Sequence, residues 1–164
     1  MKSTLIRCVA WASVILCMAL IFHFSHEPAE KSSETSATAI STTLKTISPR
    51  YNRMTETEQK SLVDTLQASV RTLSHFSLFC LLGITLSLAL SLYTVKPSLR
   101  VFIILSGCLV YAILDEYHQS FIPGRNQQVT DVLVDFAGSV VGTLLVLVIF
   151  ILVRSSTLKK AAKS

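Results

Sequence analysis

The stretch 132–153 reads VLVDFAGSVVGTLLVLVIFILV, and it decides the fold class because it is long, apolar and interrupted by only one charged residue, Asp135. A helix that crosses a bilayer needs about 20 predominantly apolar residues, and its backbone polar groups must be paired within the helix because lipid offers no partners. The stretch meets this requirement. We therefore predict a transmembrane helix that carries an acidic side chain at membrane depth.

Three further runs, at 8–24, 76–95 and 99–119, have the same apolar character. The chain as a whole is 51% hydrophobic and has a mean hydropathy of +0.56, which excludes an ordinary soluble domain. Its 164 residues suit one small domain rather than two. The sequence predicts an all-α membrane protein, a four-transmembrane-helix bundle that forms a single domain over residues 1–164.

The first apolar run has two interpretations. Lys2 and Arg7 precede it, as positive residues precede the apolar core of a cleaved signal peptide. No convincing small-residue cleavage site follows the run, so we expect it to be retained as the first span.

Positive charges set the expected orientation of the bundle. They gather before the first run, between the second and third, and after the fourth, at Lys2, Arg7, Lys96, Arg100, Arg154, Lys159, Lys160 and Lys163. Short loops rich in Lys and Arg stay on the cytoplasmic side of a membrane. We therefore expect both termini in the cytoplasm and the loop 25–74 outside. This distribution accounts for the net charge of +5, so we expect no nucleic-acid partner.

The external loop changes composition along its length. Residues 27–46 are rich in Ser, Thr, Lys and Glu, which is typical of a flexible surface segment. The sequence TETE at 55–58 then has the form of a capping box, and an apolar stripe follows at spacings of four, four and three, over Leu62, Leu66, Val70 and Leu73. We predict an extracytoplasmic amphipathic helix that continues into the second span. The outer leaflet is the expected partner of its stripe, and a second protein helix is the alternative.

Acidic residues gather near one end of the last two spans. The segment 115–125 reads DEYHQSFIPGR, and Asp131 and Asp135 follow it. A helical rise of about 1.5 Å per residue puts Asp115 and Asp135 at one level in the outer part of the membrane. Burying an unpaired charge at this depth costs several kcal/mol, and ionisable residues that are kept inside a membrane despite this cost commonly have a function. We therefore interpret Asp115 and Asp135 as functional. Asp131, at the mouth of its helix, is equally well explained as a helix cap.

Other helices bring polar groups to the same level. His75 opens the second span and Ser25 closes the first, both on the predicted outer side. Asp135 shares a helical stripe with Gly138 and Gly142, and small residues at this spacing allow a second helix to approach closely. The stripe, and with it Asp135, is therefore expected to face the interior of the bundle.

We predict one polar site at the outer face. Its candidate catalytic residues are His75, Asp115, Glu116, His118, Gln119, Asp131 and Asp135, and its candidate substrate-binding residues are Ser25 and Arg125. Asp115 or Asp135 would act as general base, His75 or His118 as acid, and Arg125 would hold a phosphate or carboxylate group. Asp115, His118 and Asp135 could alternatively bind a divalent metal ion. Because they are not a recognised ligand set, no metal ligand is assigned and the cofactor is left open.

As a combined pattern, these residues resemble the VanZ-like family of bacterial membrane proteins. The resemblance covers nearly the whole chain and rests most strongly on Asp115-Glu116-x-His118-Gln119, Pro123-Gly124-Arg125 and Asp131-Val132-x-x-Asp135-x-x-Gly138-x-x-x-Gly142, and more weakly on Phe24-Ser25 and Arg71-x-x-x-His75-Phe76. The chain departs from the family after Phe76, where an acid and a tyrosine are common. The resemblance implies a multi-pass protein of the bacterial plasma membrane, linked to the cell envelope and, through the family's name, to teicoplanin resistance.

Three functions are compatible with such a site. The first is an enzyme that acts on a lipid-linked or cell-wall substrate, and the second is a non-catalytic protein that binds an anionic head group or the glycopeptide itself. The third is a small transporter, since acids inside the membrane often mark ion paths, although four spans without broken helices favour it less. Membrane lipid is an expected partner in each case. Catalysis and oligomeric state are left open.

Overall fold

The computed structural model describes residues 2–125 and 127–161. Its elements follow in the order α1 (Lys2–Ser25), α2 (Ala29–Ile47), the short 3-10 helix η1 (Tyr51–Arg53), α3 (Glu56–Ser91), α4 (Pro97–Gln119) and α5 (Val129–Ala161). Four of these helices, α1, α3, α4 and α5, are long and apolar enough to cross a membrane. The predicted all-α class and the four spans are confirmed.

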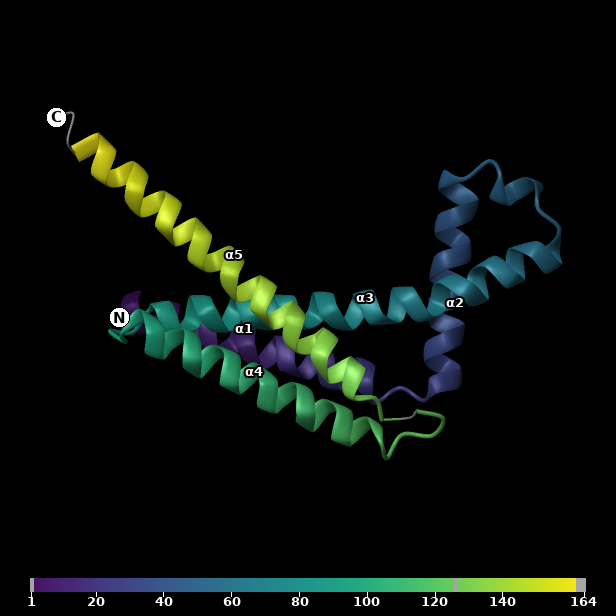
Figure 1. Ribbon diagram of the computed structural model, residues 1–164, viewed down its shortest axis with the longest axis horizontal. Helices are drawn as coiled ribbons and strands as arrows, with labels where there is room; N and C mark the ends of the chain where they lie inside the picture. Colours follow the sequence, from purple (N-terminus) through teal and green to yellow (C-terminus); the bar gives the residue numbers. More distant parts are fainter. Residues whose placement is uncertain (1, 126, 162–164) are drawn as a thin grey trace.

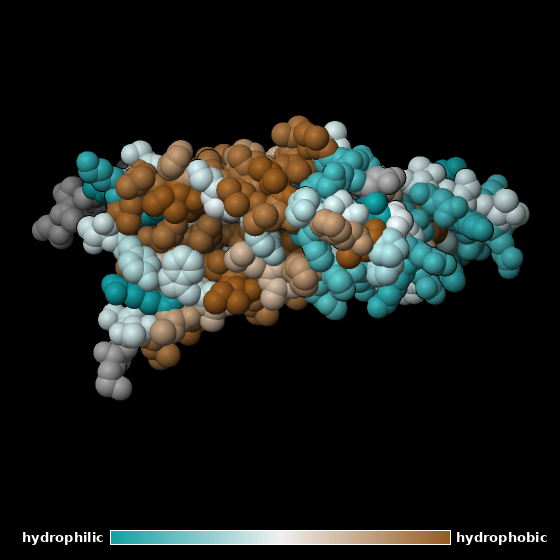
Figure 2. All heavy atoms as spheres, turned by 90° about the horizontal axis from the view of Figure 1, so that it is seen from below, coloured by the Kyte–Doolittle hydropathy of each residue, from teal (hydrophilic) through white to brown (hydrophobic). Residues whose placement is uncertain are grey.

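The four long helices form a bundle in which α1, α3 and α4 run alongside one another and α5 crosses α3 obliquely (Figure 1). Both ends of the chain lie toward the same end of the molecule, and α2 stands across α3 at the opposite end. Hydrophobic side chains cover the bundle, whereas hydrophilic ones gather toward the end that holds α2 and the start of α3 (Figure 2). This division of the surface agrees with a bundle in lipid and an α2–α3 unit in water.

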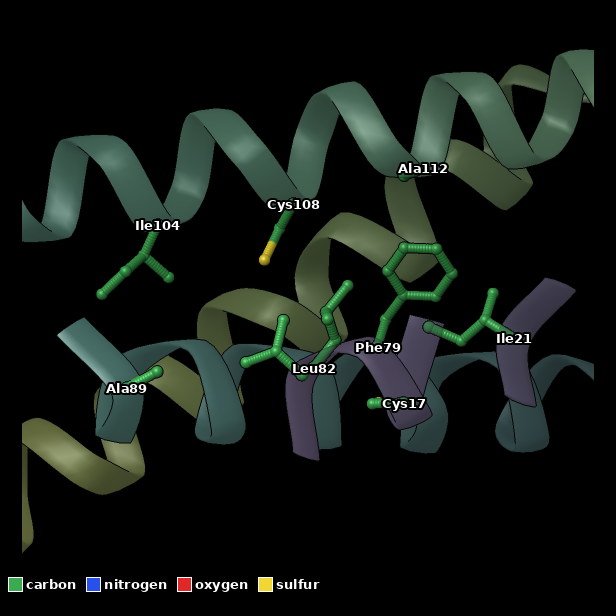
Figure 3. Packing of buried hydrophobic residues seen from close by; sticks show 9 residues of the cluster. Cys17, Ile21, Phe79, Leu82, Ala89, Ile104, Cys108 and Ala112 are labelled. Atoms are coloured by element: carbon green, nitrogen blue, oxygen red, sulfur yellow. The ribbon is translucent and has the colours of Figure 1, made fainter. Parts of the chain in front are cut away.

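Small and medium apolar side chains fill the centre of the bundle. Ile104, Cys108 and Ala112 on α4 face Phe79 and Leu82 on α3, and α1 contributes further residues to the same cluster (Figure 3). Phe79 is completely buried among them. Because lipid provides no hydrophobic driving force between spans, such close van der Waals packing, together with hydrogen bonds between helices, holds the bundle together.

The closest approach is between α3 and α5. Gly138 and Gly142 of α5 lie against the backbone of α3 at Phe76 and Cys80, and Gly83 of α3 lies against the backbone of α5. A side chain at any of the three glycines would overlap the opposite backbone. The inward-facing glycine stripe is confirmed, and it brings the first turns of α5 onto the segment of α3 that follows His75.

The segment 27–46, predicted to be flexible, belongs largely to the regular helix α2, so that prediction was wrong. Ile40 is buried there with Tyr51 and Val63, and the apolar residues packed against these three are Ala37, Leu44, Met54, Leu62, Leu66 and Val70. The helix was missed in the sequence because its many Ser and Thr residues leave only a few apolar residues on the face that packs. Tertiary packing of one face, rather than intrinsic propensity, stabilises helices of this kind.

The predicted amphipathic helix is present as the first half of α3, which runs without interruption from Glu56 to Ser91. Thr55 and Glu58 form the predicted capping box. The apolar stripe of the helix packs on α2 through residues that include Leu62, Leu66 and Val70. Three of the four stripe residues therefore have a protein helix as their partner, the alternative that the sequence left open, whereas the fourth, Leu73, is 63% exposed.

Candidate functional site

Polar side chains from all four long helices meet at the end of the bundle where α1 and α4 end and α5 begins. We call this the polar end, and its central members are Ser25, His75, Asp115, Gln119, Arg125 and Asp135. All except His75 are buried almost completely, with between 0% and 7% of their surface exposed. The structure thus brings together six of the nine residues that the sequence predicted for the site.

Asp115 lies between the ends of α1 and α4. The hydroxyl of Ser25 donates a hydrogen bond of 2.8 Å to Oδ2 of Asp115, and Nε2 of Gln119 donates a second, also of 2.8 Å, to the same oxygen. Gln119 is one helical turn after Asp115, so the i, i+4 spacing places its amide over the carboxylate. These bonds hold the carboxylate in one orientation and join α1 to α4.

Arg125 fastens the loop after α4 to the end of α1. Its Nε and Nη2 donate to the carbonyl oxygens of Glu27 and Phe24, both at 3.1 Å, and its Nη1 donates to Oε1 of Gln119 at 3.0 Å. Gly124, with φ of 75°, supplies the left-handed turn that precedes it. Burial lowers the pKa of Arg125, and the charge of Arg71 acts in the same direction. The guanidinium therefore supports the architecture of the site, while its predicted contact with a substrate stays a prediction.

Asp135 faces α3 from the second turn of α5. Its Oδ2 lies 3.6 Å from Nδ1 of His75, which is longer than a strong hydrogen bond. Its Oδ1 is buried and has no hydrogen-bond partner among the described residues. Only 2% of the residue is exposed. A buried carboxylate oxygen without a partner costs stability, so its presence needs an explanation other than folding.

The two acids predicted at one level do lie together, with His75 beside them. One potential ligand atom from each of His75, Asp115 and Asp135 lies within 4.8 Å of the other two. The three side chains come from α3, α4 and α5. Their proximity therefore depends on how the helices are rotated and crossed in the bundle.

A pocket opens beside this group. It is small, with a cavity volume of about 20 Å³, is partly open to solvent, and is lined by Arg71, Thr72, His75, Gln119, Asp131, Val134 and Asp135. Arg71 was not among the predicted site residues. Its position one helical turn before His75 was the signal available in the sequence, because residues four apart lie on one face of a helix.

The remaining predicted residues have other surroundings. Oε1 of Glu116 accepts a hydrogen bond of 2.6 Å from the backbone N–H of Gln128, just before α5 begins. His118 packs on the end of α1, with its Nε2 3.3 Å from Nδ1 of His26 and its ring stacked on Phe22. Asp131 is half-buried at the rim of the pocket. His75, rather than His118, is thus the histidine beside the two carboxylates.

Comparison with protein families gives one match that covers most of the chain. The model of the VanZ/LLP1 family matches residues 10–152, a range that includes α3 and α4 in full, most of α1 and α5, and every residue of the polar end. No curated protein and no solved structure matches the chain. The family match confirms the resemblance inferred from the sequence motifs.

Proposed function

This chain belongs to the VanZ/LLP1 family of membrane proteins, and from that premise we propose that its polar end acts on a lipid-linked or cell-wall substrate of the bacterial envelope. The substrate class follows from the family resemblance and from the place of the site, which is built into one end of a membrane-embedded bundle. A substrate with a lipid tail could remain in the bilayer while its polar head lies over the mouth of the pocket beside His75 and Asp135.

The observation that carries this proposal is the state of Asp135. Its carboxylate is buried, borders the pocket and contacts His75, yet one oxygen has no partner among the described residues. A purely structural acid in such a place would be fully hydrogen-bonded, because leaving a charged oxygen unsatisfied costs more than a typical hydrogen bond contributes. A general base needs an oxygen that is not already occupied by a hydrogen-bond donor, and Oδ1 of Asp135 meets this requirement.

The lining of the pocket suggests a division of roles. Asp135 serves as general base and takes a proton from a water molecule or a substrate hydroxyl. His75 serves as general acid and donates a proton to the departing group. Arg71 binds a phosphate or carboxylate on the substrate, since a guanidinium can engage either group through two parallel hydrogen bonds. Asp115, fixed by Ser25 and Gln119, holds the second negative charge of the site.

The test uses the full chain in lipid nanodiscs with radiolabelled lipid-linked cell-wall precursors. We expect time-dependent product formation, reduced about 100-fold or more by Asp135→Asn and by His75→Gln, since general acid-base groups typically contribute factors of this size. Asp64→Asn is the matched control, because Asp64 is an exposed acid on the same helix as His75. Its rate should equal that of the unmodified protein.

Binding and catalysis separate in the same experiment. Saturable binding of the precursor without any product would support the non-catalytic binder in place of the enzyme. Arg71→Gln should raise KM more than it lowers kcat if Arg71 holds the anionic group, whereas Arg71→Lys should keep part of the affinity. Equal rates for Asp135→Asn and the unmodified protein would contradict the proposal.

A further inference from the structure

We propose that His75, Asp115 and Asp135 together bind a divalent transition-metal ion, of the class of Zn²⁺ or Mn²⁺. The three residues offer one imidazole nitrogen and two carboxylate oxygens, all within 4.8 Å of one another. Imidazole suits Zn²⁺ and carboxylates suit Mn²⁺, and both ions accept mixed sets of nitrogen and oxygen ligands. The inference goes beyond the proposed function, because binding of an ion can be measured without any substrate.

Charge balance supports a cation at this point. Asp115 and Asp135 are buried to 4% and 2% exposure, and each is ionised when it acts as a ligand. Two negative charges this close repel one another strongly in surroundings of low dielectric constant. An ion of charge +2 would neutralise both carboxylates.

The hydrogen bonding of the two acids leaves oxygens available for an ion. Oδ1 of Asp135 is buried without a hydrogen-bond partner among the described residues, which is the independent sign of a missing ligand. At Asp115, Ser25 and Gln119 both donate to Oδ2, and no described residue donates to Oδ1. Hydrogen bonds of this type commonly orient the carboxylates that bind metals.

The distances require only a small adjustment of side chains. Two ligand atoms about 2.1 Å from one tetrahedral ion stand roughly 3.4 Å apart. The three atoms described here are separated by up to 4.8 Å, so small rotations of the side chains would close the set around an ion. The neighbouring pocket leaves room for a water molecule or a substrate atom in the remaining coordination position.

The test measures ions bound to the purified full-length protein in detergent. After chelation and dialysis, Mn²⁺ is added and its free concentration is followed by electron paramagnetic resonance, with Zn²⁺ as competitor. We expect about one saturable site per chain, and a loss of affinity of more than tenfold in Asp115→Asn, Asp135→Asn and His75→Gln. The ion should also raise the unfolding temperature of the unmodified protein.

Asp64→Asn is the matched control, because Asp64 is an exposed acid on the same helix as His75. Its affinity for Mn²⁺ should be unchanged. If the acid variants fail to fold, His75→Gln decides the question, since the His75 side chain is less buried, at 15% exposure against 3% for Asp135. Absence of a stoichiometric site in the unmodified protein, or undiminished affinity in His75→Gln, would overturn the proposal. Absence of enzymatic turnover would not.

Discussion

Gly142 of α5 lies so close to Cys80 of α3 that a Cβ atom at position 142 would overlap the Cys80 carbonyl oxygen. Together with Gly138 against Phe76, this contact sets the spacing of the two helices that carry Asp135 and His75. A change in that spacing would move the two side chains apart. The glycines therefore position the site without touching it.

Replacing Gly142 by alanine should lower the stability of the bundle by about 1–3 kcal/mol, because overpacked helices must separate or strain. Thermal unfolding in detergent measures the change. Gly107→Ala is the control, since the nearest atom to an added Cβ there is a side-chain carbon of Leu86 at 3.9 Å. That variant should be as stable as the unmodified protein or more so, because alanine favours helix. Equal unfolding temperatures for Gly142→Ala and Gly107→Ala would refute the close-contact argument.

Replacing Val63 by aspartate should detach α2 from α3, because Val63 is buried with Ile40 and Tyr51 in the small core between these helices. Amide hydrogen exchange should then speed up throughout 29–47, while the spans keep their protection. Ser61→Asp adds the same charge at an exposed position of α3 and should leave exchange unchanged. Protection of α2 that survives Val63→Asp would show that something other than this core holds the helix.

Arg125→Lys should lower the amount of protein in the membrane, although it keeps the positive charge. A lysine ammonium cannot reproduce the three hydrogen bonds that the guanidinium makes to Glu27, Phe24 and Gln119. Hydrogen bonds of charged groups contribute about 1.5–3 kcal/mol each, so the loss should be visible by immunoblot. Arg50→Lys, at an exposed position, serves as control. Normal abundance of Arg125→Lys with a lost envelope phenotype would instead favour the predicted substrate contact.

Single cysteines should report the orientation of the bundle. In a background without the four native cysteines, Thr42→Cys on α2 should react with a membrane-impermeant maleimide added to intact cells, and Thr94→Cys between α3 and α4 should not. Both threonines are exposed, so access to the reagent depends only on the side of the membrane. The expected result follows from Lys96 and Arg100, which the positive-inside rule places in the cytoplasm. The reverse labelling pattern would contradict the predicted topology.

The main architecture was predictable because its signals are local in the chain. Apolar runs of sufficient length define spans, the TETE sequence at 55–58 defines the start of α3, and the spacing of Asp135, Gly138 and Gly142 places them on one helical face. Each of these signals depends on the geometry of one helix alone. Helix periodicity and the thickness of a bilayer are therefore enough to interpret them.

What the sequence could not determine is which side chains meet across helices. His75 and His118 were both candidates for the acid of the site, and the packing of α3 and α4 in the bundle places His75 beside Asp135. Likewise, α2 is a helix because Ile40 finds a partner surface on α3, far along the chain. The sequence by itself determined the spans and the polar residues near one end of them. Only the tertiary structure decided their partners. Contacts between helices depend on crossing angles and on packing at glycines, and both depend on two helices at once rather than on one segment of the chain.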